Sequence, residues 1–133
     1  MEREYWTEVH TKHRLKYHIV WIPKYRKRIL SGKLAVRPDE LLKQACDINR
    51  WKIEGLNIQT DHIHILIQLR SDKSLAKTVP ILKDGSSRAI RKEFPKLDEF
   101  LWGNSLWADG CFAETVGIAS EDMINKYIQE QRQ

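Results

Sequence analysis

The stretch His62-Ile63-His64-Ile65-Leu66-Ile67-Gln68-Leu69 decides the fold, because it is the clearest strand pattern in the chain. Successive side chains of a β-strand point to opposite faces of the sheet. The apolar face of this strand therefore consists of Ile63, Ile65, Ile67 and Leu69. The opposite face carries His62, His64, Leu66 and Gln68. We predict a strand anchored in the core through its isoleucines, with both imidazoles on the other side of the sheet.

The segments around this strand alternate between strand and helix patterns. Further strands are predicted at residues 16–22, 51–59 and 111–118. Helices are predicted at residues 38–50, 74–94 and 120–133. Pro23 ends the first strand, Pro38 suits the first turn of the first helix, and Ser74 is a suitable cap for the second.

This order of elements predicts an α+β protein. Strand, helix, strand, strand, helix and strand follow one another in the ferredoxin-like β-α-β-β-α-β arrangement. That arrangement implies an antiparallel sheet with helices packed on one face. The seventh element, the C-terminal helix, is left free for another purpose.

Length and composition narrow the class of protein. A chain of 133 residues is expected to form one domain, spanning residues 1–133. The hydrophobic fraction of 41% excludes a disordered chain. No apolar run approaches the roughly 20 residues that cross a bilayer, and no secretory signal is visible. Cys46 and Cys111 are too few for a disulfide framework, so we expect a cytoplasmic protein without a membrane partner.

The charge balance favours a polyanionic partner. Lys and Arg number 23 against 18 acidic residues, which gives a formal net charge of +5. Five Trp and four Tyr could provide surfaces on which unpaired bases stack, although large aromatic side chains more often fill a small core. Composition therefore permits nucleic-acid binding without requiring it.

His62 and His64 are candidate metal ligands, because residues two apart on a strand project to the same side. Two histidines on the exposed face of a strand are common, so this pattern alone does not establish a metal site. Asp61 could orient the pair, or it could simply be a turn residue, which is the interpretation we favour. His18, in the first strand, is expected to be structural rather than a ligand.

The predicted C-terminal helix places a tyrosine beside a polar residue. Ile124, Tyr127, Ile128 and Gln131 follow the spacing of one helix face, so Tyr127 and Gln131 lie one turn apart. Tyr127 could be a packing residue. A tyrosine hydroxyl, with a pKa near 10, is a poor nucleophile at neutral pH unless a cation stabilises the charge or a base takes the proton.

These residues belong to a longer pattern that resembles a known family, the single-tyrosine HUH transposases of the small insertion sequences IS200 and IS605. The resemblance covers nearly the whole chain. Its marks are Lys16-Tyr17-His18-Ile19-Val20-Trp21, Pro23-Lys24-Tyr25-Arg26, Asp61-His62-Ile63-His64-Ile65-Leu66, Ser86-Ser87-Arg88, Leu106-Trp107, Phe112, Thr115-Val116-Gly117, Lys126-Tyr127-Ile128 and Gln131.

The resemblance implies a catalytic site and a reaction. His62 and His64 would bind Mg²⁺ or Mn²⁺ together with Gln131, and Tyr127 would be the nucleophile. Members of the family cleave single-stranded DNA at element ends without ATP, through a 5′-phosphotyrosine, and rejoin the strands. They act as homodimers in which the tyrosine helix of one subunit can complete the metal site of the other. Gly117-Ile118-Ala119-Ser120 would be the hinge before that helix.

The resemblance also implies recognition of imperfect DNA hairpins, which requires a basic surface. Candidate contacts are Lys24, Arg26, Lys27, Arg28, Lys83, Arg88, Arg91 and Lys92. A solvated basic face is the alternative for each of them. His10 and His13 are expected to lie near the DNA rather than at the metal.

Two other functions remain open at this point. One is a non-catalytic module that binds single-stranded nucleic acid on the same scaffold. The other is a domesticated relative that processes chromosomal palindromic repeats with the same chemistry. A covalent DNA adduct that depends on Tyr127 separates the first of these from a transposase.

Overall fold

The computed structural model describes residues 15–69 and 74–116, which contain a four-stranded antiparallel sheet. The strands are β1 (Leu15–Trp21), β2 (Lys52–Gln59), β3 (His62–Leu69) and β4 (Phe112–Thr115). Their order across the sheet is β2-β3-β1-β4, so β3 has a neighbour on each side. All three neighbouring pairs are antiparallel.

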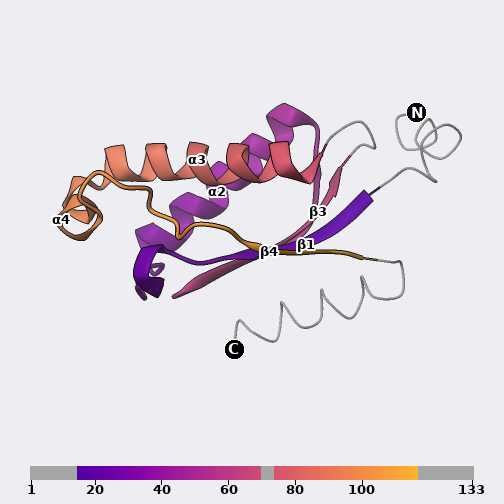
Figure 1. Cartoon of the computed structure of the whole chain (residues 1–133). Helices are drawn as coiled ribbons and strands as arrows, with labels where there is room; N and C mark the ends of the chain where they lie inside the picture. Colours follow the sequence, from indigo (N-terminus) through magenta and orange to yellow (C-terminus); the bar gives the residue numbers. More distant parts are fainter. Residues whose placement is uncertain (1–14, 70–73, 117–133) are drawn as a thin grey trace, which may run out of the picture.

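Two long helices, α2 (Lys33–Asn49) and α3 (Leu75–Glu93), lie on the same side of this sheet (Figure 1). Three short helical segments link the longer elements: η3 (Lys24–Arg26), η4 (Pro95–Leu97) and α4 (Asp98–Leu101). Among the helices in the described ranges, none combines the length and apolar character needed to cross a membrane.

The core lies between the sheet and these helices. Ile63, Ile65 and Ile67 of β3 have exposed fractions of 0%. Trp21 and Trp107 meet edge to face, with ring centroids 6.0 Å apart. Full burial of one large apolar side chain stabilises a fold by about 1.5–3 kcal/mol. The three buried isoleucines therefore hold β3 firmly in the sheet, and this fixes the position of the histidines on its other face.

The structure confirms the α+β class, the antiparallel sheet and the strand at residues 62–69. It also confirms the cap of α3, where the Ser74 hydroxyl accepts a hydrogen bond from the Lys77 backbone N–H at 3.2 Å. The helix predicted from Ser120 lies outside the described residues.

Two predicted boundaries are wrong. Helix α2 begins at Lys33 instead of Pro38, because Leu34, which precedes the proline, packs against the core. This packing outweighs the backbone hydrogen bond that a proline removes inside a helix. Strand β4 is Phe112–Thr115, so the predicted strand at 111–118 starts one residue too early and includes Val116, which is not part of the strand; residues 117 and 118 lie outside the described part of the chain.

Candidate functional site

Two imidazoles lie side by side at the start of β3. The ring centroids of His62 and His64 are 4.6 Å apart, and the rings are nearly perpendicular at 76°. His64 is buried and His62 is half-buried. Ile63, between them, is directed into the core and holds this part of the strand in place. The predicted placement of both rings on one face is confirmed, whereas metal binding stays a prediction.

Asp61 orients the first imidazole from the turn between β2 and β3. Its Oδ1 atom lies 2.6 Å from His62 Nδ1, and its Oδ2 atom accepts a hydrogen bond from Arg26 Nε at 3.1 Å. Burial acts to raise the pKa of Asp61, but hydrogen bonds from His62 and Arg26 outweigh it and hold the pKa below its usual value. The side chain is therefore an ionised carboxylate. Asp61 is a turn residue, as favoured from the sequence, and it also contacts the histidine.

His18 orients the second imidazole from the neighbouring strand. In the ladder between β1 and β3, His18 is opposite Leu66, and Val20 is opposite His64. The His18 Nε2 and His64 Nδ1 atoms are 3.3 Å apart, and the two rings are stacked. On its far side, His18 Nδ1 lies 3.6 Å from a carboxylate oxygen of Glu114 in β4. His18 is thus part of the site through its contact with His64.

Burial keeps His64 in the form that binds metals. It lowers the pKa of His64 to about 4, with smaller contributions from the neighbouring His62 and His18. Burial also lowers the pKa of His18, against the opposing influence of Glu114. Metal ions bind the neutral imidazole, so no proton has to be removed from His64 at neutral pH.

The hydrogen-bond partners assign one nitrogen of each ring to a metal. Nδ1 of His62 faces Asp61, and Nδ1 of His64 faces His18, so Nε2 of each ring is the atom that would bind the ion. With an ion at Nε2, His64 Nδ1 would donate a hydrogen bond to His18 Nε2. The proton on His18 Nδ1 would then point toward Glu114. Carboxylates that hold metal-binding histidines in this way are a common feature of metal sites. The residues present therefore fit a divalent cation.

The described residues include only part of the predicted ligand set. Within residues 15–69 and 74–116, no cluster of three or more His, Cys, Asp or Glu side chains could hold a metal. Tyr127 and Gln131, the predicted nucleophile and third ligand, lie outside the described residues, as do His10 and His13. The structure supplies two imidazoles and their supports, and the other roles stay predictions.

Sequence reasoning missed the polar residues opposite the histidines. Asn57 and Gln59 of β2 pair directly with His64 and His62, so their side chains lie on the same face. Asn57 is fully buried, and its Oδ1 accepts a hydrogen bond from Gln59 Nε2 at 2.6 Å. Their spacing of two residues repeats that of the histidines across the Thr60-Asp61 turn. This repeated spacing is the feature of the sequence from which Asn57 and Gln59 could have been predicted to lie beside the histidines.

Two of the predicted DNA contacts after β1 converge on Asp61. Arg26 and Arg28 both approach its Oδ2 atom, at 3.1 and 3.5 Å, while their side chains stay 65% and 71% exposed. Lys27 is also exposed, and its Nζ atom lies 5.2 Å from the centre of the Phe100 ring. Lys24 is half-buried, and its backbone N–H donates to the Leu106 carbonyl.

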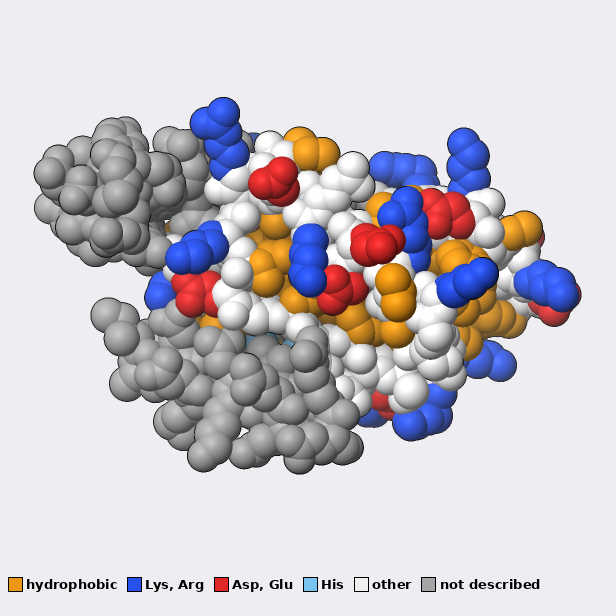
Figure 2. Space-filling model, turned by 180° about the vertical axis from the view of Figure 1, so that it is seen from behind, with side chains coloured by type: hydrophobic (Ala, Val, Ile, Leu, Met, Phe, Trp, Pro, Cys, Tyr) orange, Lys and Arg blue, Asp and Glu red, His pale blue; other side chains and the backbone are white. Residues whose placement is uncertain are grey.

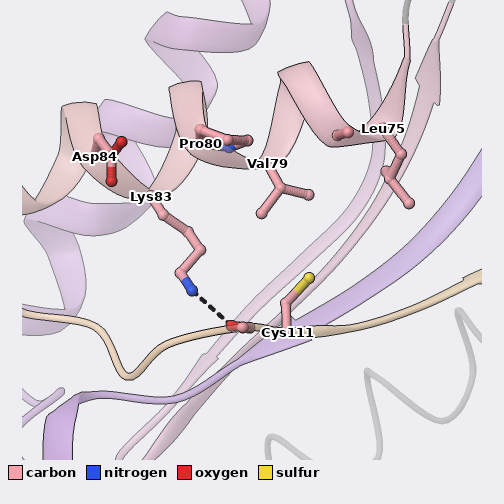
Figure 3. Close-up of a pocket in the computed structure, with 8 residues that line it drawn as sticks. Leu75, Val79, Pro80, Lys83, Asp84 and Cys111 are labelled. Atoms are coloured by element: carbon pink, nitrogen blue, oxygen red, sulfur yellow. Dashed lines mark hydrogen bonds between the residues drawn. The ribbon is translucent and has the colours of Figure 1, made fainter.

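Lys83, one of the predicted DNA contacts, is buried in the structure. The residue is 8% exposed, and its Nζ atom donates hydrogen bonds to the carbonyl oxygens of Ala108, at 2.8 Å, and Gly110, at 2.5 Å. Figure 3 shows the hydrogen bond to Gly110. Burial also lowers the pKa of Lys83. The residue fastens the segment before β4 to α3 at the edge of a pocket of about 550 Å³ that Cys111 also lines. A sequence pattern of basic residues does not distinguish such a buried lysine from a solvated one.

The remaining basic candidates on α3 differ in exposure. Arg88 and Lys92 are exposed, whereas Arg91 is half-buried and lies 3.5 Å from an Asp98 carboxylate oxygen. On the face of the molecule that Figure 2 shows, Lys and Arg side chains are interspersed with acidic and apolar ones rather than gathered in one patch. Charge alone therefore does not mark a DNA-binding surface there.

The sequence is similar to known transposases over most of its length. The family described as "Transposase IS200 like" matches residues 11–131. The chain is 30% identical over 119 residues to the ISDra2 transposase TnpA of Deinococcus radiodurans, covering 90% of this chain and 85% of that one. It is also 30% identical over 122 residues to the transposase for insertion sequence element IS200 of Salmonella typhimurium, covering 92% and 80%.

Two solved structures resemble this fold. A crystal structure described as that of a transposase from Deinococcus radiodurans R1 has a TM-score of 0.73 and 28% identity, covering 89% of this chain and 91% of the other. The structure of a REP-associated tyrosine transposase bound to a REP hairpin has a TM-score of 0.64, covering 86% and 63%. At 11% identity, the second likeness concerns the fold alone.

Proposed function

Because this chain belongs to the IS200-like transposase family, we propose that it cleaves and rejoins single-stranded DNA at insertion-sequence ends through a 5′-phosphotyrosine on Tyr127. The observation that carries the proposal is the pair of imidazoles on β3, whose ring centroids are 4.6 Å apart and whose Nδ1 atoms each lie beside a partner side chain. A non-catalytic binding module has no need for this arrangement.

The metal site would consist of His62, His64 and Gln131, with Mg²⁺ or Mn²⁺ as the ion. A bound ion would polarise a phosphate oxygen and would stabilise the charge that develops as the phenol reacts. Imidazole ligands suit Mn²⁺, and an amide oxygen also suits Mg²⁺. In the tautomers that leave Nε2 to the ion, Asp61 accepts a hydrogen bond from His62 Nδ1 and His18 Nε2 accepts one from His64 Nδ1, which holds both rings in the orientation for binding.

The proposed reaction exchanges one phosphoester for another. The Tyr127 hydroxyl loses its proton as its oxygen forms a bond to the scissile phosphorus. The bond from phosphorus to the 3′ oxygen breaks, and that oxygen takes up one proton to leave a 3′-hydroxyl. Attack of such a hydroxyl on a second phosphotyrosine restores a phosphodiester and releases the tyrosine. Since the number of ester bonds is conserved, no nucleotide cofactor is required.

We propose that the DNA substrate is recognised as a hairpin by a homodimer acting in the cytoplasm. A protein of related fold has been solved with a REP hairpin, which supports this mode of recognition. The exposed cations Arg26, Lys27, Arg28 and Arg88 are the candidates for phosphate contacts, with a smaller contribution expected from Lys24 and Arg91. We leave Lys83 out of this set, because it is buried and its ammonium group is bound to two carbonyl oxygens.

The decisive experiment is the formation of a covalent protein–DNA adduct, measured on a denaturing gel. The parent chain is incubated with single-stranded oligonucleotides from both ends of the element that encodes it, with Mn²⁺ or with a chelator. We expect an adduct that disappears with chelator, in His64→Ala and in Tyr127→Phe, while Tyr127→Phe still binds the hairpin. An adduct formed by Tyr127→Phe would refute the assignment of the nucleophile. Binding without any adduct would favour the non-catalytic module.

A further inference from the structure

The turn that follows β1 has a backbone conformation that its side chains disfavour. Tyr25 and Arg26 have φ angles of 62° and 51°, both in the left-handed region. Consecutive residues of this kind are usually Asn or Gly, because a Cβ atom makes the region costly for an L-residue. Where a large residue is nevertheless held in this region, a functional reason for the strain is a justified hypothesis.

The surrounding structure holds this strained turn in place at several points. Before the turn, the Lys24 N–H donates to the Leu106 carbonyl at 2.7 Å. After it, the Leu30 N–H donates to the Thr60 carbonyl at 3.0 Å. In its middle, Arg26 hydrogen bonds to Asp61. The turn is therefore fixed before any ligand binds, which lowers the entropy lost on binding.

Tyr25 projects from this fixed turn into solvent. The residue is 67% exposed, so its ring does not fill the core. The next three residues are basic, and Asp61, which hydrogen bonds to one of them, also contacts His62. One carboxylate thus separates the Tyr25 turn from a candidate metal ligand.

We propose that Tyr25 is a stacking platform for an unpaired DNA base close to the scissile phosphate, with Arg26, Lys27 and Arg28 neutralising the adjoining phosphates. The inference rests on the proposed function, and it adds a residue that positions the substrate. An exposed aromatic ring amid cations is the usual arrangement for binding a single strand without reading its sequence. The ring is held on a left-handed backbone and is 67% exposed, so a base can reach its face.

The test measures base stacking in the absence of catalysis. Full-length Tyr127→Phe protein, without metal, is titrated with oligonucleotides from the element ends that carry 2-aminopurine at single positions. We expect fluorescence quenching at one or two positions beside the cleavage site. Tyr25→Asn, which tolerates the left-handed backbone, should abolish that quenching and weaken binding by about five- to a hundredfold. Tyr25→Trp should retain both.

A matched control removes an exposed apolar side chain from elsewhere. Ile48 is 70% exposed and lies near the far end of α2, about 20 Å along the helix from its start. Ile48→Asn should bind and quench like the parent. The proposal is overturned if Tyr25→Asn also behaves like the parent, or if Tyr25→Trp loses as much affinity as Tyr25→Asn.

Failure of this inference can be distinguished from failure of the proposed function. If the parent chain forms the covalent adduct and Tyr25→Asn forms it with unchanged KM and kcat, only the stacking role is wrong. If quenching depends on Tyr25 but the parent chain forms no adduct, the stacking role stands and the proposed chemistry is wrong. The melting temperature of Tyr25→Asn should be equal to or above that of the parent, because the substitution relieves backbone strain.

Discussion

Replacing Asp61 by asparagine should weaken metal binding without removing a proposed ligand. The carboxylate is only 13% exposed and contacts His62 Nδ1 at 2.6 Å, Arg26 at 3.1 Å and Arg28 at 3.5 Å. The amide is isosteric but carries no charge, so it fixes the His62 tautomer less strongly. Partners of this kind typically contribute 10- to 100-fold to metal affinity or activity. We expect a Mn²⁺ affinity lower by that factor, equivalent to about 1.4–2.7 kcal/mol.

The assay is a Mn²⁺ titration of the DNA-free protein, followed by electron paramagnetic resonance or calorimetry. Asp39→Asn is the matched control, since Asp39 forms a surface ion pair with Lys43 at 2.8 Å on α2. His64→Ala, which removes a proposed ligand, shows the Mn²⁺ affinity expected when the site is lost completely. If Asp61→Asn binds Mn²⁺ as tightly as Asp39→Asn, the carboxylate does not support the metal site, and the reasoning from the Asp61–His62 contact is refuted.

Three further outcomes are expected. Lys83→Met should lower the free energy of unfolding by about 1–3 kcal/mol in a urea titration, because two carbonyl groups lose a charged donor. It should leave the affinity for DNA nearly unchanged. A large loss of DNA affinity at unchanged stability would show that Lys83 contacts DNA. A thiol reagent at pH 8 should modify the exposed Cys111 rapidly and Cys46 only on unfolding, since burial raises the pKa of Cys46 to about 12; equal rates for the two thiols would contradict this. Hydrogen bonds from Arg37 lower the pKa of Glu93. The pair therefore stabilises the fold at pH values above the ordinary carboxyl pKa, and this stabilisation is lost as the pH falls through the lowered pKa. In Glu93→Gln, the melting temperature should therefore decrease less steeply at acidic pH than in the parent.

The predictable part of the fold is that which depends on local patterns. The alternation in residues 62–69 specifies a strand with its isoleucines on one face, and no distant contact alters this result. Ser74 likewise acts through a local hydrogen bond. The start of α2 is different, because it depends on the packing of Leu34 against residues distant in sequence, and the proline rule favours the later start.

The candidate site was predictable where two residues share one element. The histidines follow from the period of a strand, but His18 joins them only through the register of β1 against β3. Its separation of 46 residues from His64 gives no local signal. The same limit applies to Lys83, because its burial depends on where the segment before β4 crosses α3.

Asp61 links the proposed chemistry to the proposed DNA contacts. One oxygen contacts a candidate metal ligand, and the other contacts two exposed arginines of the turn that carries Tyr25. A phosphate that draws Arg26 away from Asp61 would leave a larger share of the carboxylate charge for His62, and a more basic imidazole is a better ligand. Mn²⁺ and single-stranded DNA should therefore strengthen each other's binding, and by linkage the effect must be reciprocal. If the coupling persists unchanged in Arg26→Gln, it acts through direct contact between metal and phosphate rather than through Asp61.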